Sequence, residues 1–147
     1  MPALTTNKKA RFDYEILDTF EAGLVLTGQE VKSIRSGLAR LAGAFVTFNG
    51  DIPYLTNALI PFYKNAVPQK DYVADASRKL LLKKKEINYL RGKLQQKGLT
   101  IVPLSLYTSG RLVKVEIGLA QGKKQFDKRR TIKDREAKRE IARKLKE

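Results

Sequence analysis

Histidine, cysteine and tryptophan are all absent from the 147 residues of the chain. Without histidine, the usual general acid or base near neutral pH is missing. Without cysteine there can be no disulfide, no thiolate nucleophile and no zinc site of the Cys/His kind. Glycine-rich phosphate loops of the P-loop or dinucleotide type are missing as well. We therefore expect a protein that is not an enzyme, with no catalytic residues, no metal and no cofactor. An enzyme that relies only on Asp, Glu, Lys or Tyr is the minor alternative.

Long apolar runs are also absent. No stretch approaches the roughly 18 apolar residues of a membrane-spanning helix, so the sequence predicts none. Residues 1–9 lack the apolar run of a signal peptide. Because nothing in the sequence points to an oxidising compartment, we expect a cytoplasmic protein.

Acidic residues are scarce relative to basic ones. The chain carries 30 Lys plus Arg against 15 Asp plus Glu, which gives a formal charge of +15. Such an excess favours polyanions, and nucleic acid is the commonest of these, because phosphate contacts with Lys and Arg release counterions. An anionic membrane surface is the rival interpretation. The basic tail described below has no Trp and no broad apolar face, which disfavours a membrane partner.

The apolar residues, 42% of the chain, suffice for one domain with one core. Alternation of apolar and polar residues predicts strands at 12–26, 44–48, 52–55, 101–107 and 112–119. Gly23 would allow a bend or bulge in the first strand, and Asn49-Gly50 predicts a hairpin turn. Helical spacing predicts a short helix over 29–35 and a longer one over 83–97. The triple leucine at 80–82 fits either a strand or a helix start, and residues 63–77 have the polar composition of a connection.

A change in composition at Gln121 divides the chain. Residues 121–147 hold 12 Lys or Arg and 5 Asp or Glu, a net charge of +7. We expect residues 1–120 to form the folded domain, with residues 1–11 as a short basic arm. Residues 121–147 are expected to be a tail that is flexible when free and helical on an anionic partner. The strands predict a mainly β fold: an antiparallel β-barrel of the five- or six-stranded oligonucleotide-binding type, with two or three helices.

Five groups of motifs occur along the chain and together cover nearly all of it. They are Asn7-Lys8-Lys9-Ala10-Arg11; Phe20-Glu21-Ala22-Gly23-Leu24 with Glu30-Val31-Lys32-Ser33-Ile34-Arg35; Arg78-Lys79-Leu80-Leu81-Leu82; Leu104-Ser105-Leu106-Tyr107 with Lys114-Val115 and Ile117-Gly118; and Gly122-Lys123-Lys124 with Asp127-Lys128-Arg129 and Ile132-Lys133. In this order and spacing, the chain resembles the small protein B family of SsrA-binding proteins.

The resemblance implies a function in trans-translation, the rescue of stalled bacterial ribosomes. It implies an oligonucleotide-binding-like barrel that binds the tRNA-like domain of tmRNA (SsrA RNA). It also implies that the protein delivers this RNA to stalled ribosomes. It also implies that the basic tail occupies the decoding centre and the empty mRNA channel, against ribosomal RNA. Elongation factor Tu and alanyl-tRNA synthetase would act on the same RNA. The alternative is a ribosomal or tRNA-binding protein with a similar barrel.

The resemblance also marks candidate RNA-binding residues. Glu21 and Leu81 match family residues at the RNA-binding surface, although the pattern alone also fits a solvated strand residue for Glu21 and a core residue for Leu81. Where the family often has Asn after the triple leucine, this chain has Lys83, which can contact phosphate. The other basic candidates, which also fit a disordered leader or a wet helix face, are Lys8, Lys9, Arg11, Lys32 and Arg35.

The tail carries the residues that the resemblance assigns to ribosome contacts. They are Lys123, Lys124, Phe126, Asp127, Lys128, Arg129 and Lys133. Before the aspartate the family often has His or Tyr. Phe126 keeps a stacking face there but offers no hydrogen-bonding group.

The charge of the chain predicts a steep dependence of RNA binding on salt. Binding to a folded tRNA-like RNA should lie in the nanomolar range, and if about five phosphates are engaged, log K should fall with log salt at a slope of about −4. Fluorescence anisotropy titrations between low and moderate salt measure this slope. A flat response would contradict an electrostatic mode of binding.

Overall fold

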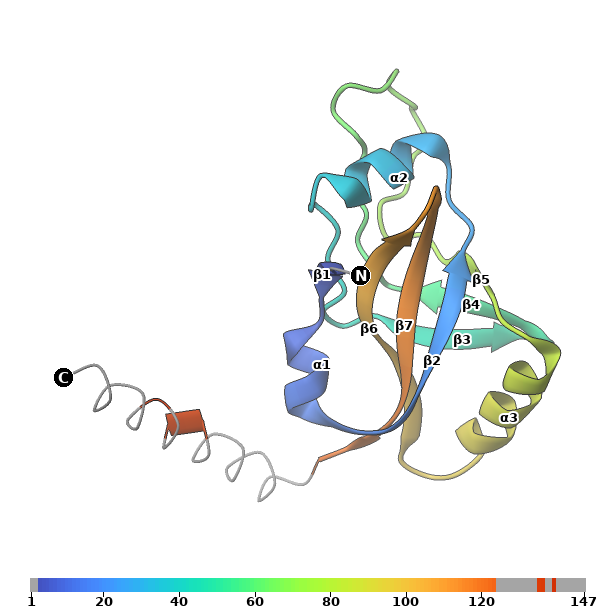
Figure 1. Cartoon of the computed structure of the whole chain (residues 1–147). Coiled ribbons are helices and arrows are strands. Elements are labelled where there is room, and N and C mark those ends of the chain that lie inside the picture. Colours follow the sequence, from blue (N-terminus) through green and yellow to red (C-terminus); the bar gives the residue numbers. More distant parts are fainter. Residues whose placement is uncertain (1–2, 124–134, 137–138, 140–147) are drawn as a thin grey trace.

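The computed structural model describes residues 3–123, 135–136 and 139, and these have the mainly β architecture that the sequence predicts (Figure 1). In chain order the described elements are β1 (Ala3–Thr6), α1 (Lys8–Asp13), β2 (Tyr14–Leu24), α2 (Gly28–Arg35), β3 (Phe45–Asn49), β4 (Ile52–Thr56), β5 (Arg78–Leu81), α3 (Lys84–Leu94), β6 (Leu99–Ser109) and β7 (Leu112–Gly122). Among these helices, none is both long enough and apolar enough to cross a membrane.

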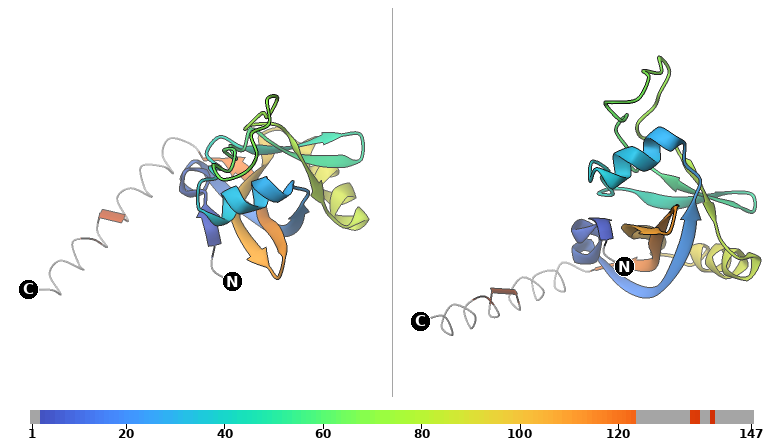
Figure 2. Two further views of the ribbon diagram at one scale, coloured as in Figure 1. Left: turned by 90° about the horizontal axis from the view of Figure 1, so that it is seen from above. Right: turned by 45° about the horizontal axis from the view of Figure 1, so that its top comes forward.

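The strands form one antiparallel sheet in the order β1-β6-β7-β2-β5-β4-β3. The sheet curls, so that β3 at one edge packs against β6, the neighbour of the other edge strand. Figures 1 and 2 show the long strands β2, β6 and β7 as one wall, with β3 and β4 crossing it. The outcome is the predicted barrel-like fold, with seven strands in place of five or six.

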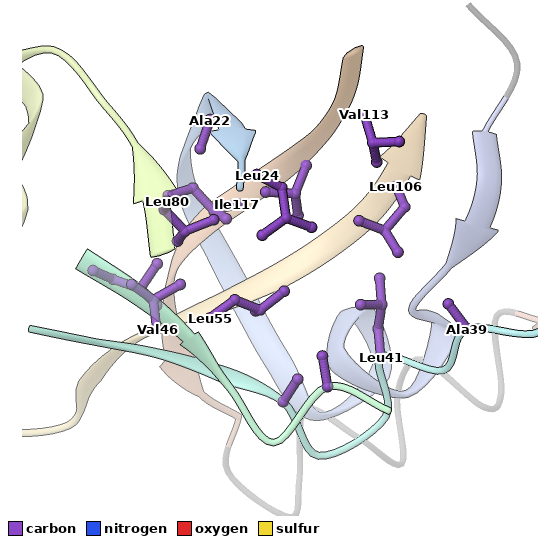
Figure 3. Packing of buried hydrophobic residues seen from close by; sticks show 14 of the residues in the cluster. Ala22, Leu24, Ala39, Leu41, Val46, Leu55, Leu80, Leu106, Val113 and Ile117 are labelled. Carbon is purple, nitrogen blue, oxygen red and sulfur yellow. The ribbon is translucent and has the colours of Figure 1, made fainter. Parts of the chain in front are cut away.

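The core lies between the long strands β2, β6 and β7 on one side and the crossing strands β3 and β4 on the other. Val113, Val115 and Ile117 of β7 are buried, which confirms the predicted alternation along this strand. Figure 3 shows Ile117 in one cluster with Leu55 of β4 and Leu80 of β5. Because successive strand residues point to opposite faces, the residues between them are left on the outer surface of the barrel.

Several predicted elements are confirmed with small changes of boundary. The short helix is α2, which begins at a capping box formed by Thr27 and Glu30. The Asn-Gly hairpin joins β3 to β4, with Gly50 at a φ of 62°. The longer helix is α3, which ends before Gly98. Of the triple leucine, Leu80 and Leu81 belong to the strand β5, and Leu82 lies between β5 and α3.

Within the basic arm expected at residues 1–11, the described residues from Ala3 onward form β1 and most of α1. Asn7 caps α1 with its side-chain oxygen, which accepts a hydrogen bond from the Ala10 N–H at 3.1 Å. Its side-chain nitrogen donates to the carbonyl oxygens of Leu41 at 3.2 Å and Pro103 at 2.9 Å. One buried amide therefore fixes a segment whose polar composition is typical of a free arm.

The first long strand differs from its prediction at both ends. Phe12 lies in α1, so β2 begins at Tyr14, and the bulge lies between Ile16 and Asp18 rather than at Gly23. Gly23 has another role: a Cβ placed there would lie 3.2 Å from the Cβ of Leu81. Glycine at this position therefore lets β5 approach β2 closely.

The last strand passes the predicted domain boundary at residue 120. β7 continues to Gly122, and the Lys123 N–H donates to the Asp13 carbonyl oxygen at 3.0 Å. The barrel thus extends a few residues into the segment that was assigned to the tail.

A buried ion pair joins α2 to the start of β5. Arg78 and Glu30 approach to 2.8 Å with both side chains at most 8% exposed, and Arg78 also donates to the Ala58 carbonyl oxygen at 2.9 Å. Arg78 further donates to the Tyr72 hydroxyl at 3.1 Å, and that hydroxyl lies 2.6 Å from the Ile60 carbonyl oxygen. The connection at 63–77 contains no helix or strand, as predicted, and Tyr72 holds it to this network.

Burial alone would raise the pKa of Glu30. The hydrogen bonds from the Thr27 N–H and from Arg78 outweigh burial, so that its pKa lies below the ordinary value of 4.5. A carboxyl group with a lowered pKa in the folded state stabilises the fold above its unfolded pKa, and this stabilisation is lost as the pH falls through the folded pKa. The ion pair should therefore make the protein sensitive to acid below about pH 4.5.

We expect Glu30→Gln to lower the free energy of unfolding by about 3–5 kcal/mol at pH 7, because it leaves Arg78 buried without its counter-charge. The difference in unfolding free energy between this variant and the unsubstituted chain should narrow as the pH falls from about 4.5, the ordinary pKa of glutamate, through the lower pKa of Glu30 in the folded state. Urea unfolding at a series of pH values measures both effects. Glu15→Gln, at an exposed position of β2, is the control and should change stability by less than about 0.5 kcal/mol. A difference in unfolding free energy between Glu30→Gln and the unsubstituted chain that stays constant from pH 7 to below about pH 4.5 would contradict the role assigned to the ion pair.

Candidate nucleic-acid interface

A groove on the outside of the barrel brings together three of the predicted RNA-binding residues: Glu21, Leu81 and Lys83. It runs between β2, β5, the start of α3 and β7. Its lining residues are Glu21, Gly23, Leu81, Leu82, Lys83, Glu86, Leu112 and Lys114. An apolar floor with charges of both signs at its rim suits a ligand that has apolar faces and polar edges.

Leu81 belongs to the surface of the groove and not to the core. The alternation along β5 buries Leu80, at 1% exposure, and leaves Leu81 56% exposed. Leu112 at the start of β7 is also exposed, at 65%, and lines the same groove. Of the two alternatives that the sequence left open for Leu81, the structure supports a position available for contact.

Glu21 projects outward from β2 and is held by two neighbours. The Lys114 Nζ lies 2.6 Å from its Oε1 and is the main cause that holds the pKa of Glu21 below its ordinary value. The Tyr107 hydroxyl donates a hydrogen bond to the same carboxylate and lowers this pKa further. Glu21 is therefore a charged, oriented acceptor at neutral pH.

Tyr107 stays protonated well beyond neutral pH. Burial, then the hydrogen bond to Glu21 and the negative charges of Glu21 and Glu116, raises the pKa of Tyr107 to about 12. Glu116 stands directly opposite Glu21 across the β2–β7 pair. Arg11 from α1 reaches Glu116 at 3.2 Å. Each of the two neighbouring carboxylates thus has its own cation, Lys114 for Glu21 and Arg11 for Glu116, which offsets the repulsion between the two glutamates.

Lys83 occupies the N-cap position of α3. Its backbone N–H donates to Glu86 Oε1 at 3.1 Å, while its side chain is exposed at the end of the groove. A lysine at this place offers a mobile positive charge beside the apolar floor.

The other basic candidates lie on two separate helices and do not line the groove. Lys8 and Lys9 are exposed on α1, next to Arg11. Lys32 and Arg35 are exposed on α2, whose buried residues include Ser33 and Ile34. A phosphate clamp between Lys32 and Arg35 stays a prediction.

Most of the predicted tail contacts lie outside the described residues: Lys124, Phe126, Asp127, Lys128, Arg129 and Lys133. Lys123 directly follows β7. Farther along, Arg135 is helical, and its guanidinium lies 5.5 Å from the centre of the Phe12 ring on α1, a cation–π contact.

Three residues of this face were missed by sequence reasoning: Tyr107, Leu112 and Lys114. The alternation along residues 112–119 did place Lys114 on the wet face of its strand. Pairing of β2 with β7, which brings Lys114 next to Glu21, joins residues more than 90 positions apart and could not be read from spacing. Within the described residues, no group of three or more Asp, Glu, His or Cys side chains is placed to hold a metal ion.

The family model of the SmpB protein matches residues 4–147. The chain belongs to this family. SmpB-family relatives named SsrA-binding protein include one from Synechococcus sp. (strain JA-2-3B'a(2-13)), 48% identical over 144 residues, which are 98% of this chain and 94% of the relative. One from Shouchella clausii (strain KSM-K16) is 50% identical over 141 residues, 96% of this chain and 90% of the relative.

A solved SmpB structure has the same fold. It is described as "tmRNA-SmpB: a journey to the center of the bacterial ribosome", and it matches with a TM-score of 0.70 and 45% sequence identity. The match covers 85% of this chain and 87% of that chain. The resemblance drawn from the five groups of motifs is thereby confirmed, and so is the fold class.

We expect Glu21→Ala and Leu81→Ala each to weaken RNA binding while the barrel stays folded. Both side chains are more than half exposed, so each substitution should change the free energy of unfolding by no more than about 0.5 kcal/mol, measured by thermal unfolding. Loss of a charged acceptor from an RNA contact should cost roughly 1.5–3 kcal/mol of binding, or about ten- to a hundredfold in affinity. Glu15→Ala, exposed on the same strand, is the matched control. A large loss of stability with intact binding would remove Leu81 from the site.

Proposed function

We propose that this chain binds the tRNA-like domain of tmRNA through the groove of Glu21, Leu81 and Lys83, and delivers that RNA to stalled ribosomes in trans-translation. The observation that carries the proposal is the groove itself: Glu21 of β2 meets Leu81 and Lys83, from a distant segment, on one exposed surface. The net charge of +15 and the relatives named SsrA-binding protein support RNA as the occupant.

Each part of the groove can contribute a different kind of contact. The Glu21 carboxylate accepts hydrogen bonds from base amines or a 2′-hydroxyl, which phosphate-binding residues cannot do. Leu81 and Leu112 offer apolar surface to an unstacked base or a ribose. Lys83 and Lys114 neutralise neighbouring phosphates. This combination favours a folded RNA that displays unpaired loop bases, such as a tRNA-like elbow, over a plain duplex.

The remaining basic residues extend the electrostatic surface beyond the groove. Lys8, Lys9 and Arg11 on α1, with Lys32 and Arg35 on α2, are proposed to contact phosphates. Such contacts fix the orientation of the RNA and raise the association rate, but they carry little selectivity. Elongation factor Tu and alanyl-tRNA synthetase enter only as proteins that act on the same RNA.

The tail is proposed to have a separate function, which is to contact ribosomal RNA. With a net charge of +7 over residues 121–147 and few apolar side chains, it gains order where ribosomal RNA supplies phosphates along its length. The decoding centre and the empty mRNA channel provide such a surface, and an mRNA in the channel would exclude the tail by volume and charge. Lys123, Lys124, Lys128, Arg129 and Lys133 would contact phosphates, with Phe126 stacked on a base and Asp127 in the turn.

Removal of residues 124–147 should separate RNA binding by the barrel from the function of the tail on the ribosome. The barrel should remain intact, because β7 ends at Gly122 and Lys123 keeps its hydrogen bond to Asp13. The shortened chain should bind the tRNA-like domain with nearly unchanged affinity and prefer it to bulk tRNA in competition, while peptide tagging on stalled ribosomes should collapse. Substitution of Asp127, Lys128 and Arg129 by Ala in the full chain should have the same effect.

Two results would contradict the proposal. Equal affinity for bulk tRNA and for the tRNA-like domain would favour a general tRNA-binding or ribosomal protein. Tagging by the shortened chain, or a loss of tagging that matches a loss of RNA affinity, would show that the tail has no separate job.

A further inference from the structure

Next to the groove, the outer side of α3 carries an aromatic contact that the proposed function does not use. The ring of Tyr89 on α3 lies 5.9 Å from that of Phe20 on β2, centroid to centroid, with a tilt of 50°. Phe20 packs partly against the core, whereas Tyr89 is 44% exposed. A tyrosine that served only to hold α3 on the barrel would be expected to bury more of its ring.

Tyr89 and Phe20 form two walls of a small hollow. Its lining residues are Asp18, Phe20, Lys85, Glu86 and Tyr89, and most of the exposed lining is apolar. Glu86 lines both this hollow and the groove of Glu21, Leu81 and Lys83. The hollow is therefore the continuation of the groove along the first turns of α3.

In the lining itself Asp18 and Glu86 outnumber Lys85, but the helical segment beside the hollow is strongly basic, which favours a polyanion nearby. Residues 83–97 contain six basic side chains and one acidic side chain. The Lys93 Nζ lies 5.6 Å from the centre of the Tyr89 ring, a cation–π contact that leaves its positive charge beside the hollow.

The two carboxylates in the lining already have backbone partners. Glu86 Oε1 accepts from the Lys83 N–H, and Asp18 Oδ1 accepts from the Thr19 N–H at 2.9 Å. They can still accept hydrogen bonds at their remaining lone pairs, which suits the amino group of a base.

We propose that this hollow holds an unpaired base of the same RNA, stacked on the ring of Tyr89, with Lys85 and Lys93 on the adjoining phosphates. The proposal rests on the proposed function, because the groove must bind RNA for its continuation to do so. An aromatic ring beside basic side chains is the usual arrangement for sequence-tolerant stacking of single-stranded bases. The base in the hollow would add affinity for a loop that the groove alone does not reach.

Tyr89→Leu is the variant that tests the stacking, because it keeps an apolar side chain but removes the aromatic face. In the full chain, it should weaken binding of the tRNA-like domain of tmRNA by roughly 5- to 100-fold at constant salt. Tyr89→Phe should bind like the unsubstituted chain. Asn88→Ala, at the neighbouring exposed position of α3, is the control for disturbance of the helix. Circular dichroism melts of all four chains should coincide within a few degrees.

An RNA substitution locates the partner of Tyr89. Unpaired loop nucleotides of the tRNA-like domain are replaced one at a time by abasic nucleotides, and each RNA is titrated with the unsubstituted chain and with Tyr89→Leu. At one position the abasic change should weaken binding to the unsubstituted chain about as much as Tyr89→Leu does, and should add nothing in that variant.

Failure of this proposal can be told apart from failure of the proposed function. Unchanged affinity of Tyr89→Leu, or abasic effects that add to it at every position, would overturn the stacking site, while weakened binding by Glu21→Ala would leave the groove intact. If Glu21→Ala, Leu81→Ala and Tyr89→Leu all bind like the unsubstituted chain, both proposals are wrong.

Discussion

The buried ion pair between Glu30 and Arg78 determines how the site is presented. Arg78 is the first residue of β5 and points inward to Glu30 of α2. This contact determines which of the following residues of β5 face the core and which face outward. With a period of two, Leu80 then enters the core and Leu81 faces outward. A slip of one residue would bury Leu81 and expose Arg78 together with Leu80. Gly23 completes the arrangement, since a Cβ at this position would lie 3.2 Å from the Cβ of Leu81 and would push β5 slightly away from β2.

The protein combines two kinds of electrostatics that serve different ends. Its excess of basic residues acts on phosphates at long range and gives affinity that depends on salt rather than on sequence. Glu21 acts at short range, and in a chain of net charge +15 its carboxylate is oriented by Lys114 and Tyr107. An acceptor of this kind repels phosphate and favours base amines or 2′-hydroxyls, so it selects how the RNA is placed on the groove.

The parts of the fold with a strong local pattern could be predicted from the sequence. The structure confirms the alternation along β7, the Asn-Gly hairpin between β3 and β4, and the longer helix, α3, within residues 83–97. The errors have a common cause, which is that the deciding contact joins distant residues. The N-terminal segment is ordered because Asn7 bonds to Leu41 and Pro103. The side of Leu81, which the sequence left open, is likewise decided by a distant contact, the pairing of Arg78 with Glu30. The same reason explains why Glu21 could be named as a candidate while its partners Tyr107 and Lys114 could not.

The central claim is that RNA lies on the outer face of β2, β5 and β7. Methyl NMR of the full chain with a soluble paramagnetic agent tests it most directly, because the methyl groups of Leu81 and Leu112 are exposed in the free protein. On addition of the tRNA-like domain of tmRNA, these methyl groups should lose their contact with the agent. The methyl groups of Leu59 and Val73, which are exposed in the connection between β4 and β5, should keep their contact with the agent. Protection of Leu59 or Val73, with Leu81 and Leu112 still accessible, would contradict the account.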